Sequence, residues 1–168
     1  PMPQTASRPL TAEEQAILAL GWRSTPADTA MRWSGGAWRL APHLDLLSRE
    51  CANIADRSVR LIVEMPVRHG KSELVSHWTP VWFLSNWPEK RVMLASYEAT
   101  FAASWGRKAR NTILENLGIG LRLAGDSAAT STWEIQQGGG MVTAGVGGPL
   151  TGRGADLLIV DDPIKNAE

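Results

Sequence analysis

The sequence predicts an α/β fold in which helices flank a mostly parallel sheet. Short apolar and β-branched runs, at 59–65, 92–97 and 157–160, alternate with longer segments whose apolar residues recur at helical spacing. Strands that alternate with helices in this way favour a parallel sheet. The run at 157–160 is nearly all apolar, which is typical of a strand buried on both faces. A length of 168 residues is enough for one domain with its own core.

The first 37 residues are predicted to be an N-terminal arm with one short helix, followed by a domain at 38–168. Three prolines within residues 1–10 favour an extended arm. Thr11 and Glu14 have the spacing of a capping box, which predicts a helix to about Leu20. The glycine, proline, serine and threonine content of 21–37 predicts a loop.

The first half of the domain is predicted as helix, strand, loop and helix. Apolar residues at helical spacing predict a helix from about Pro42 to Ala55. A strand at 59–65 and a loop at 66–70 follow. The next helix should run from Lys71 to about Asn86, with a kink near Pro80.

The second half is predicted as strand, helix, hairpin and strand. The strand at 92–97 precedes a helix at 98–116, which Gly118 and Gly120 end. A turn of three glycines at 138–140 joins two hairpin strands, at 132–136 and 141–144. A glycine-rich loop at 145–154 leads to the apolar strand at 157–160.

Composition excludes several classes of site. Seventeen basic residues balance seventeen acidic residues, so the overall charge indicates neither nucleic-acid nor membrane binding. Cys51 is the single cysteine, which excludes a disulfide within the chain and a zinc site of the CxxC type. No apolar run approaches the roughly 18 residues of a membrane span, and no membrane partner is expected.

The segment 59–72 has the features of a phosphate-binding loop. Free amides at a helix start favour anions, and Gly70 lets the backbone approach a ligand closely. The Lys71 ammonium can pair with the β- and γ-phosphates, and the Ser72 hydroxyl can ligate Mg²⁺. ATP and Mg²⁺ are therefore the expected cofactors. The nucleotide-binding residues are predicted to be Pro66, Val67, Arg68, His69, Gly70, Lys71, Ser72 and Glu73.

This loop departs from the usual GxxxxGK[ST] pattern, because Met65 stands where the first glycine belongs. An ordinary strand-to-helix turn is the alternative interpretation. Arg68 is either an exposed loop arginine or a catalytic second cation at the γ-phosphate. His69 is expected to be structural rather than catalytic.

Two carboxylates, Asp161 and Asp162, follow the apolar strand at 157–160. Ligands bind at the carboxyl ends of strands in such sheets. We assign Asp161 to Mg²⁺ and Asp162 to the attacking water, as a catalytic base. A solvated pair of surface carboxylates is the alternative. Lys71 and Asp161 lie 90 residues apart, which fits two central strands of one sheet.

Arginines outside the loop give two further candidates. Arg153 lies between two glycines just before the last strand, where it can act as a catalytic arginine finger in its own subunit or a neighbour's. The alternative is a turn with an exposed arginine. Arg107, Lys108 and Arg110 form a basic cluster on the helix at 98–116. We favour a solvated helix face there over contact with a nucleic-acid backbone.

Several blocks of the sequence share one family resemblance. The loop at 65–73, the strand end at 95–97, the glycine-rich block at 145–156 and the block at 158–166, which includes the end of the last strand, occur in this order. Together they resemble the large terminase subunit of bacteriophages, the ATP-driven motor that packages DNA into capsids. Val67 stands where that family often has a second proline. The resemblance spans roughly residues 38–168.

The resemblance implies a P-loop NTPase fold of the RecA-like, additional-strand (ASCE) type and double-stranded DNA as cargo. It implies that Lys71 and Ser72 hold phosphate and Mg²⁺ and that Arg68 senses the γ-phosphate. Asp161 and Asp162 would form the motif on the metal side. It also implies a portal protein and a small terminase subunit as partners, a ring-shaped homo-oligomer and the cytoplasm of an infected bacterial host.

The family's coupling motif, later strands and RNase H-like nuclease domain are not among these 168 residues, so a fragment of the motor is expected. Two other functions stay open. A helicase-like, nucleic-acid-dependent ATPase should carry a DExx-type motif where this sequence has Asp161-Asp162-Pro163. The third function is a non-catalytic interaction module that keeps a P-loop scaffold.

Overall fold

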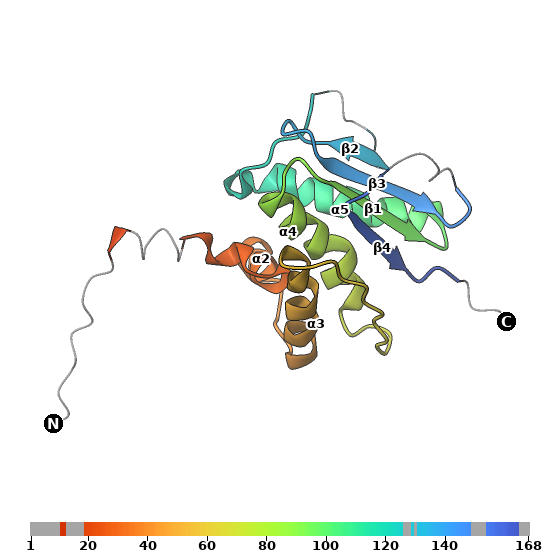
Figure 1. The fold of residues 1–168 in the computed structure, drawn as a ribbon, viewed down its shortest axis with the longest axis horizontal. Coiled ribbons are helices and arrows are strands. Elements are labelled where there is room, and N and C mark those ends of the chain that lie inside the picture. Colours follow the sequence, from red (N-terminus) through yellow and green to blue (C-terminus); the bar gives the residue numbers. More distant parts are fainter. Residues whose placement is uncertain (1–10, 13–18, 126–128, 130, 149–153, 165–168) are drawn as a thin grey trace.

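Four strands form one mixed sheet in the order β2-β3-β1-β4 in the computed structural model (Figure 1). The structure describes residues 11–12, 19–125, 129, 131–148 and 154–164. The central strand β1 (Arg91–Ser96) pairs in parallel with β3 (Gly140–Gly145) and with β4 (Leu157–Asp161). β2 (Thr132–Glu134) pairs antiparallel with β3. The predicted α/β class with a mostly parallel sheet is confirmed.

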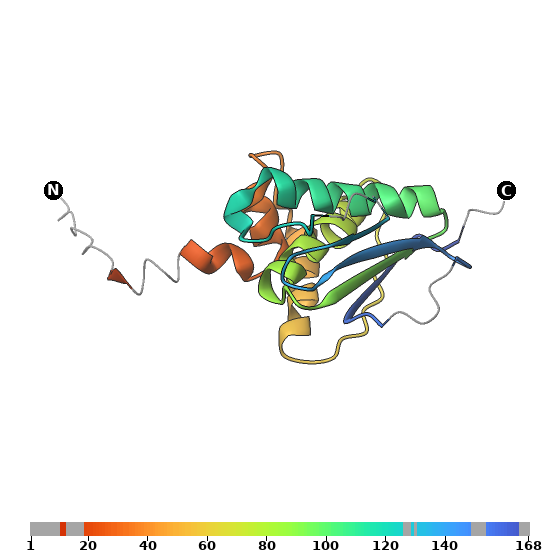
Figure 2. The same ribbon diagram turned by 90° about the horizontal axis from the view of Figure 1, so that it is seen from above.

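Helices pack on this sheet. Figure 1 shows α4 between the sheet and the pair α2 and α3, and Figure 2 shows α5 running along one face of the sheet. Among the described residues, no helix has both the length and the hydropathy that a bilayer crossing requires. The helical elements are η1 (Gly21–Arg23), α2 (Pro26–Trp33), α3 (Pro42–Ala52), η2 (Asn53–Ala55), η3 (Glu73–Trp78), α4 (Thr79–Asn86), α5 (Ala99–Glu115) and η4 (Leu117–Ile119).

The main core lies between one face of the sheet and helices α4 and α5. Val92 is paired with Met141 on one side and with Leu157 on the other, so these three side chains share a face. All three are buried with Ile113 of α5 and with residues 81–84 of α4 in one apolar cluster. Burial of this face against two helices fixes the position of β4, and therefore of its carboxyl end.

Most of residues 21–37 are helical, contrary to the loop predicted from composition, and only 24–25 and 34–37 lie outside η1 and α2. Residues 26–33 form α2, which begins as helices often do, with proline in the first turn after a threonine cap. The Thr25 hydroxyl accepts a hydrogen bond from the Asp28 amide at 3.2 Å. Ala27 and Ala30 of α2 are buried with Leu44 and Leu47 of α3. The local cap signal and this packing outweigh the glycine and serine content.

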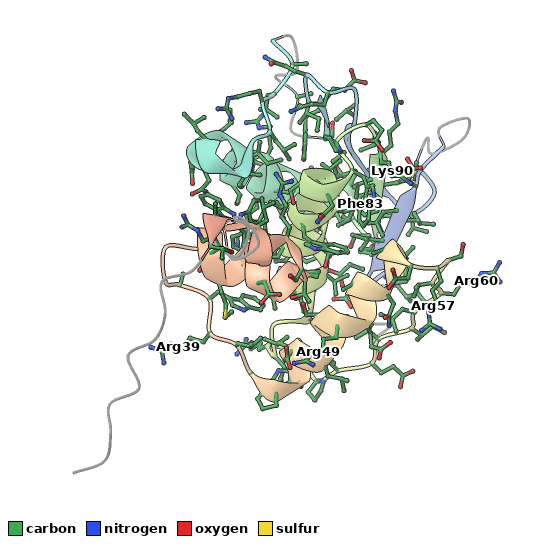
Figure 3. The ribbon with its side chains drawn as sticks, turned by 60° about the vertical axis from the view of Figure 1, so that its left-hand side comes forward. Arg39, Arg49, Arg57, Arg60, Phe83 and Lys90 are labelled. Atoms are coloured by element: carbon green, nitrogen blue, oxygen red, sulfur yellow. The ribbon has the colours of Figure 1, made fainter. Side chains whose placement is uncertain are left out.

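The strand predicted at 59–65 is wrong as a member of the sheet. The segment has no regular secondary structure, and among the described residues it forms no strand ladder and β4 pairs only with β1. Val59, Leu61 and Val63 face the residues of β4 across a cavity of about 170 Å³. This cavity separates the two segments, whereas paired strands lie about 4.8 Å apart. Figure 3 shows Arg60 of this segment pointing outward.

The last strand is formed as predicted, but it is not buried on both faces. Leu157 and Ile159 lie in the core, whereas Leu158 is 59% exposed and Val160 is 53% exposed. Only the face with Leu157 and Ile159 packs against helices. The apolar run therefore predicted the strand correctly, but not that one of its faces is exposed.

The predicted helix from Lys71 to Asn86 is confirmed, with an irregularity just before Pro80. Residues 73–78, η3, are a π-helical stretch that continues directly into α4. Proline has no amide hydrogen to donate to the preceding turn, and a widened turn absorbs that loss. The Thr79 hydroxyl donates to the Leu74 carbonyl at 2.9 Å within this turn.

Two further predicted helices and the predicted hairpin are present in the structure. The helix at 42–55 is present, with a 3₁₀ turn as its last three residues, and the helix at 98–116 is α5. The hairpin around the three glycines is β2 and β3. The helix predicted between Thr11 and Leu20 and the loop at 145–154 lie partly outside the described residues, and the arm at 1–10 lies wholly outside them. The domain boundary between 37 and 38 stays a prediction.

Gly139 is required at the hairpin turn because the backbone passes too close for a side chain. A Cβ there would lie 2.3 Å from the Lys90 carbonyl oxygen and 2.4 Å from that of Pro88. The Gly139 amide also donates to the Pro88 carbonyl at 2.9 Å. This contact fixes the turn against the start of β1.

We therefore expect Gly139→Ala to lower the free energy of unfolding by roughly 2–4 kcal/mol, because two rigid carbonyls must move. Urea denaturation followed by circular dichroism measures this change. Gly21→Ala is the control, since a Cβ at Gly21 meets no atom within 4 Å. Equal midpoints for the two variants would contradict the turn assignment.

Candidate functional site

The loop between residue 65 and η3 folds around a concave site. Residues 65–73 and Asp162 line a hollow of about 340 Å³. Gly70 has φ 86°, and a Cβ there would lie 3.1 Å from a methyl group of Leu44. Glycine is therefore required at this position both for the left-handed backbone and for the close approach of α3. Arg68 also has a positive φ, 63°, which is strained for a residue with a side chain.

Two histidines hold the loop. The His69 ring donates from Nδ1 to the Val67 carbonyl at 2.8 Å. His43 of α3 donates from Nε2 to the His69 carbonyl at 3.1 Å. These contacts restrain the backbone on both sides of Arg68. They give His69 a structural part in the loop, as expected from the sequence.

The central contact of the site joins this loop to the end of β4. The Lys71 ammonium lies 2.8 Å from Asp162 Oδ1 and 3.5 Å from Asp161 Oδ1. The hydrogen bond to Asp162 raises the pKa of Lys71, burial opposes it, and the charge of Asp161 adds to the increase. Lys71 is therefore a cation held at the strand end, although it lies 90 residues from Asp161 in the sequence.

The two carboxylates differ in environment. Asp161 is 4% exposed, whereas the Asp162 side chain is 63% exposed. Asp162 has φ 45°, and its carbonyl accepts a hydrogen bond from the Tyr97 amide at 3.1 Å. This left-handed turn, anchored to the residue after β1, directs the carboxylate toward Lys71. A strained backbone that is held by its neighbours is common at functional sites.

A buried hydroxyl holds Asp161. Ser76 of η3 donates to Asp161 Oδ2 at 2.9 Å, and Ser76 is 0% exposed. One carboxylate oxygen therefore faces the helix and the other faces Lys71. A buried carboxylate without such donors would be strongly destabilised.

A second polar network ties η3 to α5. Glu73 accepts from Nδ1 of His77 at 2.8 Å and from the Lys108 ammonium at 2.5 Å. Nε2 of His77 lies 2.7 Å from the Thr112 hydroxyl. Burial tends to raise the pKa of Glu73, but the hydrogen bonds from His77 and Lys108 outweigh it and lower the pKa to about 2. Burial lowers the pKa of His77, against the influence of Glu73.

The residues present fit a single Mg²⁺ ion, although no group of three or more potential metal-ligating histidine, cysteine, aspartate or glutamate residues occurs in the described part of the chain. Mg²⁺ sites of nucleotide enzymes need only one or two carboxylates, since phosphates and water complete the shell. Asp161 supplies a carboxylate oxygen at the site. Ser72 is half-buried, and its hydroxyl has no hydrogen-bond partner among the described residues.

The structure brings together most of the residues that the sequence singled out. Residues 66–73 and Asp162 line one hollow, and Asp161 adjoins it through its 3.5 Å contact with Lys71. Arg68 is at this site but exposed, with no ion-pair partner among the described residues. Arg153 lies outside the described residues, and its role as a finger stays a prediction. In the basic cluster on α5, Arg107 and Lys108 are exposed, as expected for a solvated helix face, and Lys108 is also paired with Glu73.

Sequence reasoning missed the residues behind the site, which are Ser76, His77 and Thr112. A signal was available for two of them. Ser76 follows Ser72 by four residues, as His77 follows Glu73, and residues at that spacing share a helix face. Thr112 comes from α5 and gave no local signal.

Comparison with known protein families, curated proteins and solved structures finds no match to this chain.

The Lys71 ammonium, which a bound anion would contact, is paired with Asp162 in this structure. We expect Asp162→Asn to bind inorganic tripolyphosphate about three- to tenfold more tightly, since the exposed pair is worth on the order of 1 kcal/mol and a like charge is removed. Isothermal titration calorimetry measures the affinity. Asp156→Asn is the matched control, because Asp156 pairs with Lys90 at the opposite end of β4. Weaker binding by Asp162→Asn would contradict the assigned anion site.

The lowered pKa of Glu73 predicts a dependence of stability on pH. The ionised carboxylate is stabilised in the folded state, so this stability is fully present above the usual pKa of 4.5 and is lost as the pH falls toward 2. Allowing for partial exposure, its size is on the order of 2 kcal/mol. Glu73→Gln should flatten the fall in unfolding free energy between these pH values.

Denaturant titrations at pH 5 and pH 3 measure this effect, with Glu115→Gln, a change of an exposed residue at the end of α5, as the control. If Glu73→Gln and Glu115→Gln lose equal stability on acidification, the hydrogen bonds to Glu73 do not set its pKa.

Proposed function

We propose that this chain binds a nucleoside triphosphate, ATP, over the loop at 66–72 and hydrolyses it. The observation that carries this proposal is the position of the Lys71 ammonium, 2.8 Å from Asp162 and 3.5 Å from Asp161. A cation from a glycine-containing loop at a helix start, next to carboxylates at a strand end, is the arrangement that phosphoryl transfer uses. A P-loop NTPase fold of the RecA-like type is part of this proposal.

Binding would begin with an exchange of partners at Lys71. A phosphate chain brings more negative charge to the ammonium than the exposed carboxylate of Asp162 does, so phosphate takes the place of Asp162. Amides at the start of the helix add donors, and Gly70 leaves them open to a ligand. The histidine contacts of the loop keep these amides in place before the ligand arrives.

Hydrolysis would use the residues that the exchange sets free. Asp162, once released from Lys71, is an exposed carboxylate that can accept a proton from the attacking water. The exposed guanidinium of Arg68 can move to the terminal phosphate. Asp161 and Ser72 would hold Mg²⁺, which, when bound, offsets the negative charge of the phosphates. Arg153 is proposed as a further cation, in the same subunit or in a neighbour.

The motor function is proposed on the sequence blocks that resemble large terminases. In this proposal the chain is the ATPase part of a motor that moves double-stranded DNA into a procapsid in the bacterial host cytoplasm, with a portal protein and a small terminase subunit as partners. A ring of identical subunits would form the motor. Within the structure, the pair of Lys108 and Glu73 supports a physical link between the nucleotide site and α5.

One observation favours a second candidate, a non-catalytic module that keeps the phosphate loop. The segment at 59–65, which should anchor the loop, forms no ladder with a described strand. A loop anchored by side chains alone can bind an anion without holding it in line for attack. This candidate predicts nucleotide binding without turnover.

We expect Lys71→Ala to lower ATP turnover by roughly 10²–10³-fold or more, because the cation that meets the transferred phosphoryl group is lost. Release of phosphate measures turnover, and a fluorescent ATP analogue measures binding. The control is Lys90→Ala, which removes a lysine of a surface ion pair at the other end of β4.

Equal turnover of wild type and Lys71→Ala would remove the phosphate-loop assignment. Binding by wild type that Lys71→Ala weakens, with no turnover by wild type, would instead select the non-catalytic module.

A further inference from the structure

Ser76 belongs to none of the motifs in the sequence, yet it makes the closest buried polar contact with Asp161. Its hydroxyl lies 2.9 Å from Asp161 Oδ2, and the two residues are 0% and 4% exposed. The hydrogen bond joins η3 to β4, elements 85 residues apart in sequence. Such a hydrogen bond either only satisfies two buried polar groups or also sets the direction of the carboxylate.

The two oxygens of Asp161 have separate partners. Oδ2 accepts the Ser76 hydroxyl, and Oδ1 faces Lys71 at 3.5 Å. A carboxylate held through one oxygen cannot rotate about its last bond without losing that hydrogen bond. Ser76 therefore keeps Oδ1 as the oxygen that faces the phosphate loop.

The elements on both sides of this bond are rigid. Asp161 is the last residue of β4 and stands opposite Ser96 of β1 in the ladder. Ser76 lies in the π-helical stretch, where the neighbouring His77 is bonded to Glu73 and to Thr112 of α5. Neither end of the bond is in a loop. The direction of Oδ1 is thus set by the sheet and by two helices.

We propose that Ser76 is a positioning residue for a divalent cation, because it aims one oxygen of Asp161 at the site where the phosphates bind. This inference rests on the proposed function and adds a residue to it. Ser72 and Ser76 then act on successive turns of one helix, the first as a ligand and the second by orienting a ligand. Residues that orient a metal ligand typically contribute 10–100-fold to metal affinity.

The test measures Mn²⁺ bound by this chain together with a non-hydrolysable ATP analogue, with electron paramagnetic resonance reporting free Mn²⁺. Ser76→Ala removes the hydroxyl that aims Asp161. Ser85→Ala is the matched control, because Ser85 is also a buried serine of this helical run and donates to the Trp82 carbonyl at 2.8 Å. Thermal unfolding and analogue binding in EDTA are followed for both variants.

We expect Ser76→Ala to weaken Mn²⁺ binding about 10–100-fold and Ser85→Ala to leave it within about twofold. Ser76→Ala should lower the unfolding temperature more than Ser85→Ala, because the buried Asp161 carboxylate loses a donor, but both variants should remain folded and bind the analogue equally in EDTA. Mn²⁺ affinities that are alike in the two variants would overturn the positioning role and leave the proposed function standing. A wild type that retains no Mn²⁺ with the analogue would overturn the proposed function and this inference together.

Discussion

The contact of Lys71 with two carboxylates at the end of β4 is the interaction on which the rest of the site depends. It needs a lysine at the start of a helix, and it needs a strand whose acidic carboxyl end lies beside that helix start. Burial sets the position of the strand end, because β4 pairs with the central strand and its inner face packs with α4 and α5. One ammonium faces two carboxylates there, and a bound phosphate would change that balance of charge.

Polar bonds behind this contact give the site its rigidity. Ser76 joins η3 to β4, and the network of Glu73, His77, Lys108 and Thr112 joins η3 to α5. A shift of the helix start on binding therefore has to be shared by a strand and a second helix. Packed elements joined by such bonds tend to move between discrete arrangements.

The sequence predicted what local patterns determine. The acid residues after an apolar run, the glycine before Lys71 and the three-glycine turn each act within a few residues, and each is found where it was expected. That residues 59–65 join no described strand was not predictable, because sheet pairing depends on neighbours distant in sequence. The glycine, proline, serine and threonine content of 21–37 predicted a loop where α2 forms, because the signal for that helix is a single threonine cap before proline. Ser76 was missed although it lies four residues after Ser72 on the same helix face, because that spacing does not identify Asp161 as its partner.

The most direct test of this account is the structure of the chain crystallised with a non-hydrolysable ATP analogue and Mg²⁺. The decisive quantity is the distance from the Lys71 ammonium to the nearest phosphate oxygen. The account predicts a distance of about 2.7–3.0 Å, with Asp162 displaced from Lys71 and Asp161 still bonded to Ser76. An analogue bound elsewhere, with the ion pair of Lys71 and Asp162 intact, would contradict it.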